Sequence, residues 1–451
     1  MHDTIFALST IFGQSGIAVI RISGPKAFQI LPFLGVDASL IPRKALHTKL
    51  WTLNKDSILD DALIIPFMSP NSFNGEDILE LHLHGSIAVI NDVIGELDKI
   101  QFLRVAEPGE FTKIAFYNGK IDLTKAEGLA DLLNAETSLQ RHLAQKQLSG
   151  ELEDLYEKWR QQLVTILAQL EALIDFPEDE IPEDVLEATL NLVRSLSDEI
   201  SYYLKASERS DKIMQGINIV ISGAPNVGKS SLLNLIAQKD VAIVSDIAGT
   251  TRDIVKCKLD LEGFSIVLMD TAGIRSETQD TIELEGIRRA KMAIKNASIN
   301  ITIFDNLSEL AVLEECSKNT IIVINKTDLM LPEEIADRVA QILYSGSISQ
   351  DNIILTSTKH ETNLDVLLNK ILEIVKREYS TAVNEPAITR LRQQNRLKEC
   401  LYYLARFNLD LPLEIASQEI RFASECIGHL SGRIHTEEIL DEVFTSFCIG
   451  K

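Results

Sequence analysis

The segment 223–230, with the sequence GAPNVGKS, restricts the fold of this chain more than any other feature. Apolar residues precede it at 217–221 and a helical run follows it, so the pattern predicts a strand, a phosphate-binding loop and a helix. In such a loop, backbone N–H groups turn inward around the phosphates of a nucleotide. Lys229 offsets the negative charge of the two outer phosphates, and the Ser230 hydroxyl can ligate Mg²⁺. The alternative is a chance match in a glycine-bearing loop, and its probability in this context is roughly one in twenty.

Three further motifs follow in the order that a guanine-nucleotide site requires. The strand-like run FSIVLMDTAG contains Asp270 and Gly273. The carboxylate of Asp270 can reach Mg²⁺ through water, and the backbone amide of Gly273 can meet the γ-phosphate. NKTD ends in Asp328, whose carboxylate can accept hydrogen bonds from guanine N1 and N2, donors that adenine lacks there. DIAGTTRD, at 246–253, lies where a switch loop belongs, and either of its threonines can close on Mg²⁺. A GTPase domain is therefore expected, with these nucleotide contacts: Asn226, Val227, Gly228, Lys229, Ser230, Ser231, Ser245, Asp246, Ile247, Ala248, Gly249, Thr250, Thr251, Asp270, Thr271, Ala272, Gly273, Asn325, Lys326 and Asp328.

The group that orients the attacking water is less obvious. Ras-type GTPases use a glutamine directly after D-T-A-G, and this chain has Ile274 there. The carboxylates that follow are candidates, although they also fit a solvated acidic face: Glu277, Asp280, Glu283 and Glu285. The amide oxygen of Asn226 can help to hold a monovalent cation, which would offset transition-state charge as an arginine finger does.

The composition limits where such a protein works. With 451 residues, 45% of them hydrophobic, the chain can bury the cores of two or three domains. Its net charge of −22 repels a phosphate backbone, so an RNA substrate requires a local basic patch or a partner. The cysteines form no C-x-x-C pair, which favours reduced cytosolic thiols. Neither a secretory signal nor a membrane-length apolar run is found, so a cytoplasmic location is expected.

The chain ends in SFCIGK, with the thiol of Cys448 close to the C-terminus. A prenylation box requires two aliphatic residues and a different last residue, so Gly450 and Lys451 exclude it. Cys448 can act as a nucleophile or as a positioning group, although no basic neighbour precedes Lys451 to favour the thiolate. A small apolar plug packed against a helical bundle is the alternative.

The pattern of elements predicts three domains. Residues 1–118 mix strand-like runs (GIAVIRISG, DALIIPFM and DILELHLHG) with one or two helices. Residues 215–378 alternate apolar strands with helices, as in a parallel α/β sheet. Residues 119–214 and 379–451 are helical and are expected to pack into one bundle. The predicted fold class is α/β plus all-α. One helix carries an apolar face formed by Leu152, Leu155, Trp159, Leu163, Ile166, Leu170 and Ile174.

Together these features resemble one family, the MnmE (TrmE) tRNA modification GTPases, over nearly the whole chain. The resemblance rests on DTIFALST, GIAVIRISG, SFNGEDILELHLHG, EPGEFTKIAFYNGKIDLTKAEGLADL, IDFPEDEI, the nucleotide motifs and the terminal FCIGK. It implies a Ras-like G domain inserted in a helical domain, behind an N-terminal folate-binding and dimerisation domain. It also implies action with the flavoprotein MnmG on the wobble uridine of certain tRNAs. There a carboxymethylaminomethyl or aminomethyl group would be added at C5 with a folate-borne carbon.

The resemblance also implies roles for particular residues. The contacts to 5-formyltetrahydrofolate, or a related tetrahydrofolate, would be Arg21, Glu80, Lys120 and Lys451, although each taken singly fits a surface ion pair better. Mg²⁺ would be bound by Ser230 and Thr251. K⁺, between the face-to-face G domains of a homodimer, would be bound by Asn226, Ser245, Ile247 and Thr250. Glu283 would orient the water, with Glu285 as the alternative because the preceding loop has one extra residue, and Cys448 is the second catalytic candidate.

Two other classes share a G domain. A ribosome-assembly GTPase such as Era or Der predicts a basic RNA-binding module or a second G domain. A membrane ion-transport GTPase predicts a membrane span. The sequence offers neither feature, so the tRNA-modification hypothesis is preferred.

Overall fold

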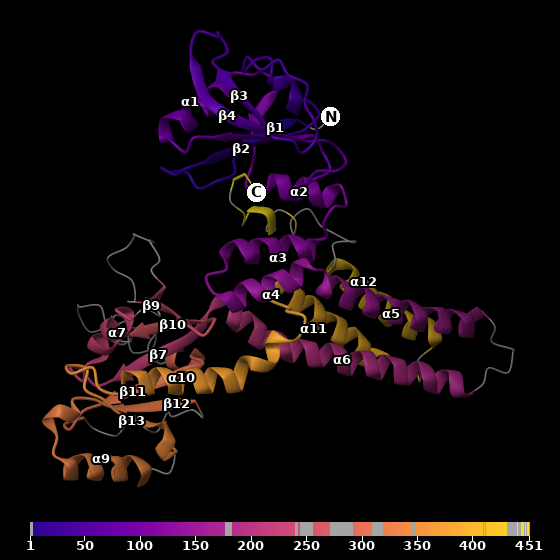
Figure 1. The fold of residues 1–451 in the computed structure, drawn as a ribbon. Helices are drawn as coiled ribbons and strands as arrows, with labels where there is room; N and C mark the ends of the chain where they lie inside the picture. The colour runs from indigo at the N-terminus through magenta and orange to yellow at the C-terminus, as the bar shows by residue number, and fades with distance from the viewer. Residues whose placement is uncertain are drawn as a thin grey trace, which may run out of the picture. The chain divides into compact units, whose positions relative to one another are not determined.

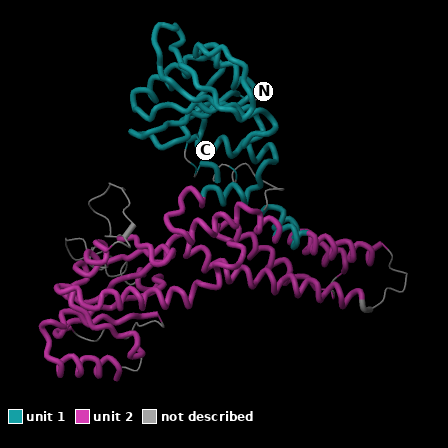
Figure 2. Tube along the Cα trace, viewed as in Figure 1, with its two compact units in different colours: residues 1–130, 156–160, 424–451 teal, residues 131–155, 161–423 magenta. Residues whose placement is uncertain are grey.

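The structure of the chain is a computed structural model, shown as a ribbon in Figure 1. It describes residues 3–175, 183–239, 242–243, 256–270, 292–308, 319–344, 348–408, 410, 412–430, 440, 443–445, 447 and 449–450. Two compact units are distinguished in Figure 2: unit 1 is residues 1–130, 156–160 and 424–451, and unit 2 is residues 131–155 and 161–423. This division groups residues by compactness, and the predicted three-domain boundaries stay a prediction.

Unit 1 is built on a sheet whose described strands follow the order β3-β4-β5-β2-β1-β6. Helix α1 buries Ile90, Val93 and Leu97 against one face of it. Helix α2 places Phe111 against Ile5 on the opposite face, since successive side chains of a strand alternate between faces. The predicted strand-like runs are confirmed as β2, β4 and β5. The bounds are β1 (Thr4–Leu8), β2 (Ala18–Ser23), β3 (Leu46–Trp51), β4 (Ile58–Phe67), β5 (Ile78–Leu83), β6 (Leu103–Val105), α1 (Ile87–Leu97), α2 (Glu110–Tyr117) and the 3₁₀ helix η1 (Ala27–Ile30).

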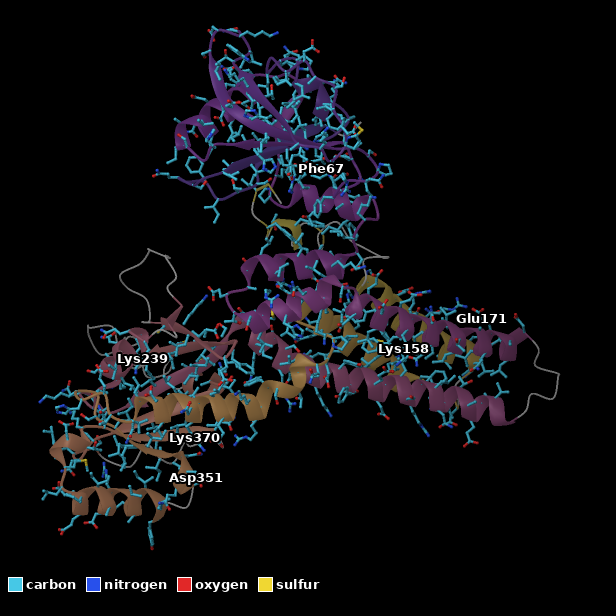
Figure 3. The ribbon with its side chains drawn as sticks, viewed as in Figure 1. Phe67, Lys158, Glu171, Lys239, Asp351 and Lys370 are labelled. Atoms are coloured by element: carbon cyan, nitrogen blue, oxygen red, sulfur yellow. The ribbon has the colours of Figure 1, made fainter. Side chains whose placement is uncertain are left out.

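Long helices occupy the chain on either side of the inserted α/β part. They are α3 (Leu123–Asn134), α4 (Ser138–Leu148), α5 (Glu151–Asp175), α6 (Glu183–Gln215), α11 (Leu391–Arg406) and α12 (Leu413–Leu430). Within unit 2, the Thr189 hydroxyl of α6 donates to Gln169 of α5 at 2.9 Å. Arg421 of α12 pairs with Glu171 of α5, labelled in Figure 3, at 2.8 Å. Helices from both sides of the insertion thus pack together, as the sequence predicted.

The predicted apolar face of α5 is confirmed, and Leu173 adds to it. Its first six members, from Leu152 to Leu170, are each at most 8% exposed. At the C-terminal end Leu173 is buried, whereas Ile174 is only partly buried. Positions 173 and 174, three and four after Leu170, both lie on the apolar side of this helix, so Leu173 is an additional member of the predicted face.

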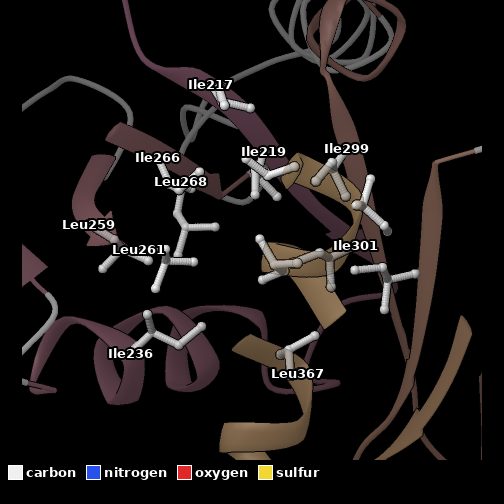
Figure 4. Close-up of a cluster of buried hydrophobic side chains, with 14 of the residues drawn as sticks. Ile217, Ile219, Ile236, Leu259, Leu261, Ile266, Leu268, Ile299, Ile301 and Leu367 are labelled. Carbon is white, nitrogen blue, oxygen red and sulfur yellow. The ribbon is translucent and has the colours of Figure 1, made fainter. Parts of the chain in front are cut away.

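The inserted part of unit 2 is a sheet with its described strands in the order β13-β12-β11-β7-β10-β9-β8. Five neighbouring strands of this sheet are parallel, so their carboxyl ends meet at one edge: β13, β12, β11, β7 and β10. Figure 4 shows its core, where Ile236 of α7 and Leu367 of α10 lie on the same side of Ile219 and Leu268. The bounds are β7 (Ile217–Gly223), β8 (Ala242–Ile243), β9 (Lys256–Leu261), β10 (Phe264–Asp270), β11 (Ile299–Phe304), β12 (Thr320–Ile324), β13 (Ile353–Leu355), α7 (Lys229–Ala237), α9 (Pro332–Tyr344), α10 (Leu364–Tyr379), η4 (Thr327–Leu329), η5 (Gln350–Asn352) and η6 (Ser380–Val383).

Among the described helices, none is both long and apolar enough to cross a membrane.

Candidate functional site

Two glycines shape the predicted phosphate loop, because neither position has room for a side chain. Gly223 has a φ of +142°, and a Cβ there would lie 2.3 Å from the carbonyl oxygen of Ile303. Gly228 has a φ of +103°, and its Cβ would lie 2.3 Å from Nδ2 of Asn325. Between them Asn226 has a φ of +63°, a conformation that asparagine adopts more readily than most residues. The loop between β7 and α7 therefore runs close against the neighbouring strand ends.

Two residues predicted to meet Mg²⁺, Ser230 directly and Asp270 through water, contact each other. The Ser230 hydroxyl donates to Oδ2 of Asp270 at 2.7 Å, and Asp270 is buried at the end of β10. Lys229, a residue only 8% exposed, donates through its ammonium to the carbonyl oxygens of Gly223 at 3.1 Å and Ala224 at 2.8 Å. Hydroxyl and carboxylate oxygens are the protein ligands that Mg²⁺ prefers, so the Ser230–Asp270 pair fits that ion.

The predicted guanine motif is tied directly to the phosphate loop. Asn325 is fully buried, and its Nδ2 donates to the carbonyl oxygen of Val227 at 2.8 Å. Its Oδ1 accepts from the backbone N–H of Thr358 at 3.0 Å. Lys326 donates to the carbonyl oxygen of Asn226 at 2.7 Å. Three loops from different strand ends are therefore held as one unit.

Asp328 is held ready to accept hydrogen bonds. The Ser357 hydroxyl donates to its Oδ1 at 2.6 Å. This bond is the main cause that lowers the pKa of Asp328 below its ordinary value, and the nearby charges of His360 and Lys359 act in the same direction. The side chain therefore stays ionised, and an ionised carboxylate has only acceptor sites to offer.

Several predicted site residues lie outside the described part of the chain. They are Ser245, Asp246, Ile247, Ala248, Gly249, Thr250, Thr251, Thr271, Ala272, Gly273, Ile274, Glu277, Asp280, Glu283, Glu285, Cys448 and Lys451. Their roles stay predictions. Ser231 is described, and it is exposed on α7.

In unit 1, the predicted folate residues Arg21 and Glu80 face each other on β2 and β5. Nη2 and Nε of Arg21 donate to Oε1 of Glu80 at 2.9 and 3.1 Å. The other oxygen of Glu80 lies 3.2 Å from Nε2 of His82. The guanidinium lies 5.9 and 5.8 Å from the ring centroids of Phe73 and Phe111. With 21% and 16% of their side chains exposed, Arg21 and Glu80 form a largely covered pair and not a surface ion pair.

The loop after β4 connects this pair to Lys120. The ammonium of Lys120 donates to the carbonyl oxygen of Pro70 at 2.6 Å, in the loop that also carries Phe73. The buried Asn74 of the same loop donates to the hydroxyl of Ser23 on β2 at 2.8 Å. Lys120 and Arg21 therefore contact the same loop, part of which belongs to the SFNGEDILELHLHG motif.

The described residues of the C-terminal tail lie on unit 1 of their own chain. Ile449 forms a β-bridge with Pro108. The Ser9 hydroxyl donates to the carbonyl oxygen of Gly450 at 3.0 Å. Gly450 has a φ of +96°, and a Cβ there would lie 2.3 Å from the carbonyl oxygen of Leu8. The glycine of the terminal motif is therefore needed where the tail crosses the end of β1.

Buried aromatic residues anchor the chain just before this tail. Phe444 and Phe447 pack in one apolar cluster with Leu123 and Ala126 of α3. At Gly109, with a φ of +69°, a Cβ would lie 2.3 Å from the carbonyl oxygen of Phe444. The apolar side chains of this segment thus dock it on α3.

A histidine that sequence reasoning missed lies at the end of β5. Nδ1 of His84 lies 2.7 Å from Oδ1 of Asp60, and the backbone N–H of His84 donates to the other oxygen at 2.8 Å. The Asp60 carboxylate is 8% exposed, whereas the ring of His84 is 70% exposed. The hydrogen bond and charge of Asp60, with a smaller contribution from Asp61, raise the pKa of His84 above its ordinary value.

We expect the imidazole of His84 to titrate with a pKa above the ordinary 6.5, measured by NMR of the ring nuclei in the full chain. A raised pKa means that the Asp60–imidazolium interaction adds stability below the ordinary pKa and is lost as the pH rises through the pKa of the folded state. Asp60→Asn is expected to remove most of the upward shift. Asp61→Asn, the matched control, is expected to remove less, and an equal fall in both variants would contradict the assignment to Asp60.

The phosphate loop, the Ser230–Asp270 pair and the ionised Asp328 together define a P-loop GTPase. Two family models cover most of the chain: the TrmE N-terminus matches residues 4–120 and the MnmE helical domain matches residues 123–448. A tRNA modification GTPase MnmE from Rickettsia typhi is 43% identical over 454 residues, and one from Rickettsia bellii is 44% identical over 454 residues. In both comparisons all of each chain is covered.

The chain belongs to the MnmE family of tRNA modification GTPases, so the resemblance inferred from its motifs is confirmed. Its expected activity as a GTP hydrolase is confirmed with it. Among solved structures, the chain is similar to Era in complex with MgGDPNP and a 16S ribosomal RNA fragment, with 28% identity and a TM-score of 0.29. That similarity covers 35% of this chain and 56% of Era.

Proposed function

We propose that this chain is a K⁺-activated GTPase that acts as a cytoplasmic homodimer, with the flavoprotein MnmG, on the wobble uridine of certain tRNAs. The reaction adds a carboxymethylaminomethyl or aminomethyl group at C5, with one carbon from 5-formyltetrahydrofolate or a related tetrahydrofolate. The observation that carries the proposal is the full-length similarity to tRNA modification GTPases.

In the GTPase site the chain's own residues position the nucleotide and offset its charge. Lys229 would exchange the carbonyl oxygens of Gly223 and Ala224 for the outer phosphates. Ser230, with Thr251, would bind Mg²⁺, which supplies charge neutralisation at the phosphate oxygens. Asp328 would select guanine through N1 and N2.

The phosphate loop also fits a K⁺ site at Asn226. Its positive φ and the Lys326 bond to its carbonyl oxygen hold the backbone in place, which leaves the side-chain amide as an oxygen donor. Ser245, Ile247 and Thr250 would complete the site. The ion would supply positive charge near the transferred phosphoryl group, as an arginine finger does.

The surroundings of the Arg21–Glu80 pair in unit 1 fit a folate. Phe73 offers a partly exposed aromatic face beside Arg21, and a flat pterin ring can stack on such a face. Glu80 can pair with the amide-like donors of the pterin. The cations of Lys120 and Lys451 suit glutamyl carboxylates. Arg21 donates twice to Oε1 of Glu80, and Nε2 of His82 lies beside Oε2, so a pterin would share Oε2 with His82 or displace one of these partners.

Nucleoside analysis of tRNA from a deletion strain tests the proposal as a whole. The C5-modified wobble uridine is expected to disappear and to return when the chain is expressed from a plasmid. An unchanged set of modified nucleosides would overturn the proposed substrate, while leaving the GTPase activity of the family untouched.

GTP hydrolysis by the full chain is expected to be fast in K⁺ and poor in Na⁺, because the Asn226 site must match the larger ion. Asn226→Ala should abolish this preference and leave nucleotide binding nearly intact. The measurement is the turnover rate in matched KCl and NaCl. Equal wild-type rates in both salts would exclude a K⁺ site.

Cys448→Ser and deletion of 449–451 should both abolish wobble-uridine modification in cells while GTP hydrolysis in K⁺ continues. The serine variant keeps the size of the side chain but removes thiolate chemistry, whereas the deletion removes the contacts of the tail with Ser9 and Pro108. Fully modified tRNA in the Cys448→Ser strain would rule out a chemical role for the thiol and would leave only the docking role.

A further inference from the structure

We propose that Glu136 and helix α4 couple the nucleotide state of the G domain to the helical domain by contacting the hairpin of β9 and β10. This hairpin, residues 256–270, is called the interswitch hairpin here. In the sequence it joins the predicted switch loop, which precedes β9, to the D-T-A-G motif, which begins at the last residue of β10. The proposal rests on the GTPase activity of the family and not on the proposed uridine chemistry.

The interswitch hairpin contacts the start of α4 at two points. Nζ of Lys258, on β9, lies 2.6 and 2.7 Å from the two carboxylate oxygens of Glu136. At the hairpin turn, a Cβ on Gly263 would lie 2.7 Å from Oγ of Ser138, so the turn backbone lies directly against the first residue of α4. A shift of the hairpin would therefore change its contacts with the start of α4.

Gln140 connects this contact to the strand that carries the phosphate loop. Its side chain is almost fully buried, and Oε1 accepts from the backbone N–H of Glu136 at 2.9 Å. Its Nε2 donates to the carbonyl oxygens of Ile213 at 3.3 Å and Met214 at 2.9 Å, at the end of α6. One residue beyond that end, at Gly216, the chain turns into β7. The backbone of Glu136 is therefore fixed to the entrance of the G domain.

The other end of α4 is fixed to the exit of the G domain. Lys146 donates at 3.4 Å to the carbonyl oxygens of both Val383 and Glu385, which follow α10. Between the two ends Leu143 is buried in the same core as Leu261 and Phe264 of the interswitch hairpin. Helix α4 thus contacts the entrance, the exit and the hairpin.

The contacts differ in how easily they can change. Gln140 and Leu143 are buried, so losing their contacts would leave unpaired groups or a cavity. The Lys258–Glu136 pair is partly exposed, at 36% and 31%, and such pairs break and form at little cost. With both ends of α4 held, the ion pair is the contact that can respond to a small displacement of the hairpin. It is therefore the point at which the nucleotide state would bias α4.

The chain offers a matched control on the same hairpin. Glu262, at the turn, pairs with Lys376 of α10 at 2.6 Å. This pair joins the hairpin to another G-domain element and does not involve α4. Reversing the charge of Lys376 tests whether the loss of any ion pair on the hairpin has the same effect on α4 as the loss of the Lys258–Glu136 pair.

The experiment is hydrogen–deuterium exchange of α4 in the full chain, with GDP and with a non-hydrolysable GTP analogue, in Mg²⁺ and K⁺. The wild type is expected to show about a fivefold or greater difference in α4 exchange between the nucleotides, the lower range of a typical coupling between sites. Lys258→Glu should remove the difference, and the double reversal with Glu136→Lys should restore it. Lys376→Glu should keep it.

The outcomes separate coupling from a merely structural role. A wild type with equal α4 exchange in both nucleotides would overturn the proposal, as would a Lys258→Glu variant that keeps the full difference. If Lys258→Glu unfolds at lower temperature, Glu136→Gln, which removes charge without reversing it, replaces it in the same comparison. No tRNA is present, so failure of the proposed uridine modification cannot produce either result.

Discussion

Asp328→Asn is expected to weaken GTP binding about 10²-fold or more and to raise the affinity for xanthosine triphosphate. The carboxylate would accept two hydrogen bonds from guanine, each worth about 1.5 kcal/mol or more because one partner is charged. About 1.4 kcal/mol corresponds to a factor of ten in affinity. The side-chain amide of the variant can instead donate to the C2 oxygen of xanthine while its oxygen accepts from N1. Affinities are measured by titration with fluorescent nucleotides.

Ser357→Ala is the matched control for this prediction. It removes the hydrogen bond that lowers the pKa of Asp328 but keeps the carboxylate itself. GTP binding should weaken less than in Asp328→Asn, and guanine should remain preferred over xanthine. Because the carboxylate must be ionised, the loss of binding on acidification should begin at a higher pH in Ser357→Ala. Unchanged GTP affinity in Asp328→Asn would show that this carboxylate does not select the base.

Glu283→Ala is expected to lower the GTP turnover rate by about 10²-fold or more, the usual scale for losing a positioned general base. GTP affinity should hardly change, because the carboxylate would act only on the attacking water. The prediction comes from the sequence, since Glu283 lies outside the described residues. Single-turnover hydrolysis in K⁺ separates the chemical step from nucleotide release.

Glu285→Ala decides between the two neighbouring carboxylates. It should leave the turnover rate close to that of the wild type if Glu283 orients the water. A larger loss in Glu285→Ala than in Glu283→Ala would show that the extra residue of the preceding loop moves the functional position along the chain. Equal, small losses in both would place the function on Glu277 or Asp280.

The GTPase site was predictable because its chemistry depends on residues that are close together in the sequence. A phosphate loop requires Gly223 and Gly228 at fixed spacing, with Lys229 and Ser230 directly after them. Apolar runs before Asp270 and Asn325 predicted strands, and parallel strands bring their carboxyl ends to one edge. The Ser230–Asp270 contact follows from that rule.

The partners of the folate candidates could not be predicted from local pattern. The resemblance implied Glu80 as a folate contact but named no partner within the chain; the register of β2 and β5 pairs it with Arg21, and His82 lies beside its second oxygen. The Asp60–His84 contact joins residues of β4 and the end of β5. Such pairs depend on strand register and on where strands end, and neither has a signature in the sequence.

The sequence by itself determined the family, the fold class, the order of the nucleotide motifs and the strand or helix identity of most segments. Each of these depends on residue type and short-range spacing, which decide local backbone conformation and which face is apolar. Only the tertiary structure decided that Gly450 crosses the end of β1 and that Gln140 joins Glu136 to the end of α6. The Gly450–Ser9 and Gln140–Met214 contacts connect residues far apart in the sequence, and a buried polar group takes whichever partner the packed chain brings within hydrogen-bonding distance.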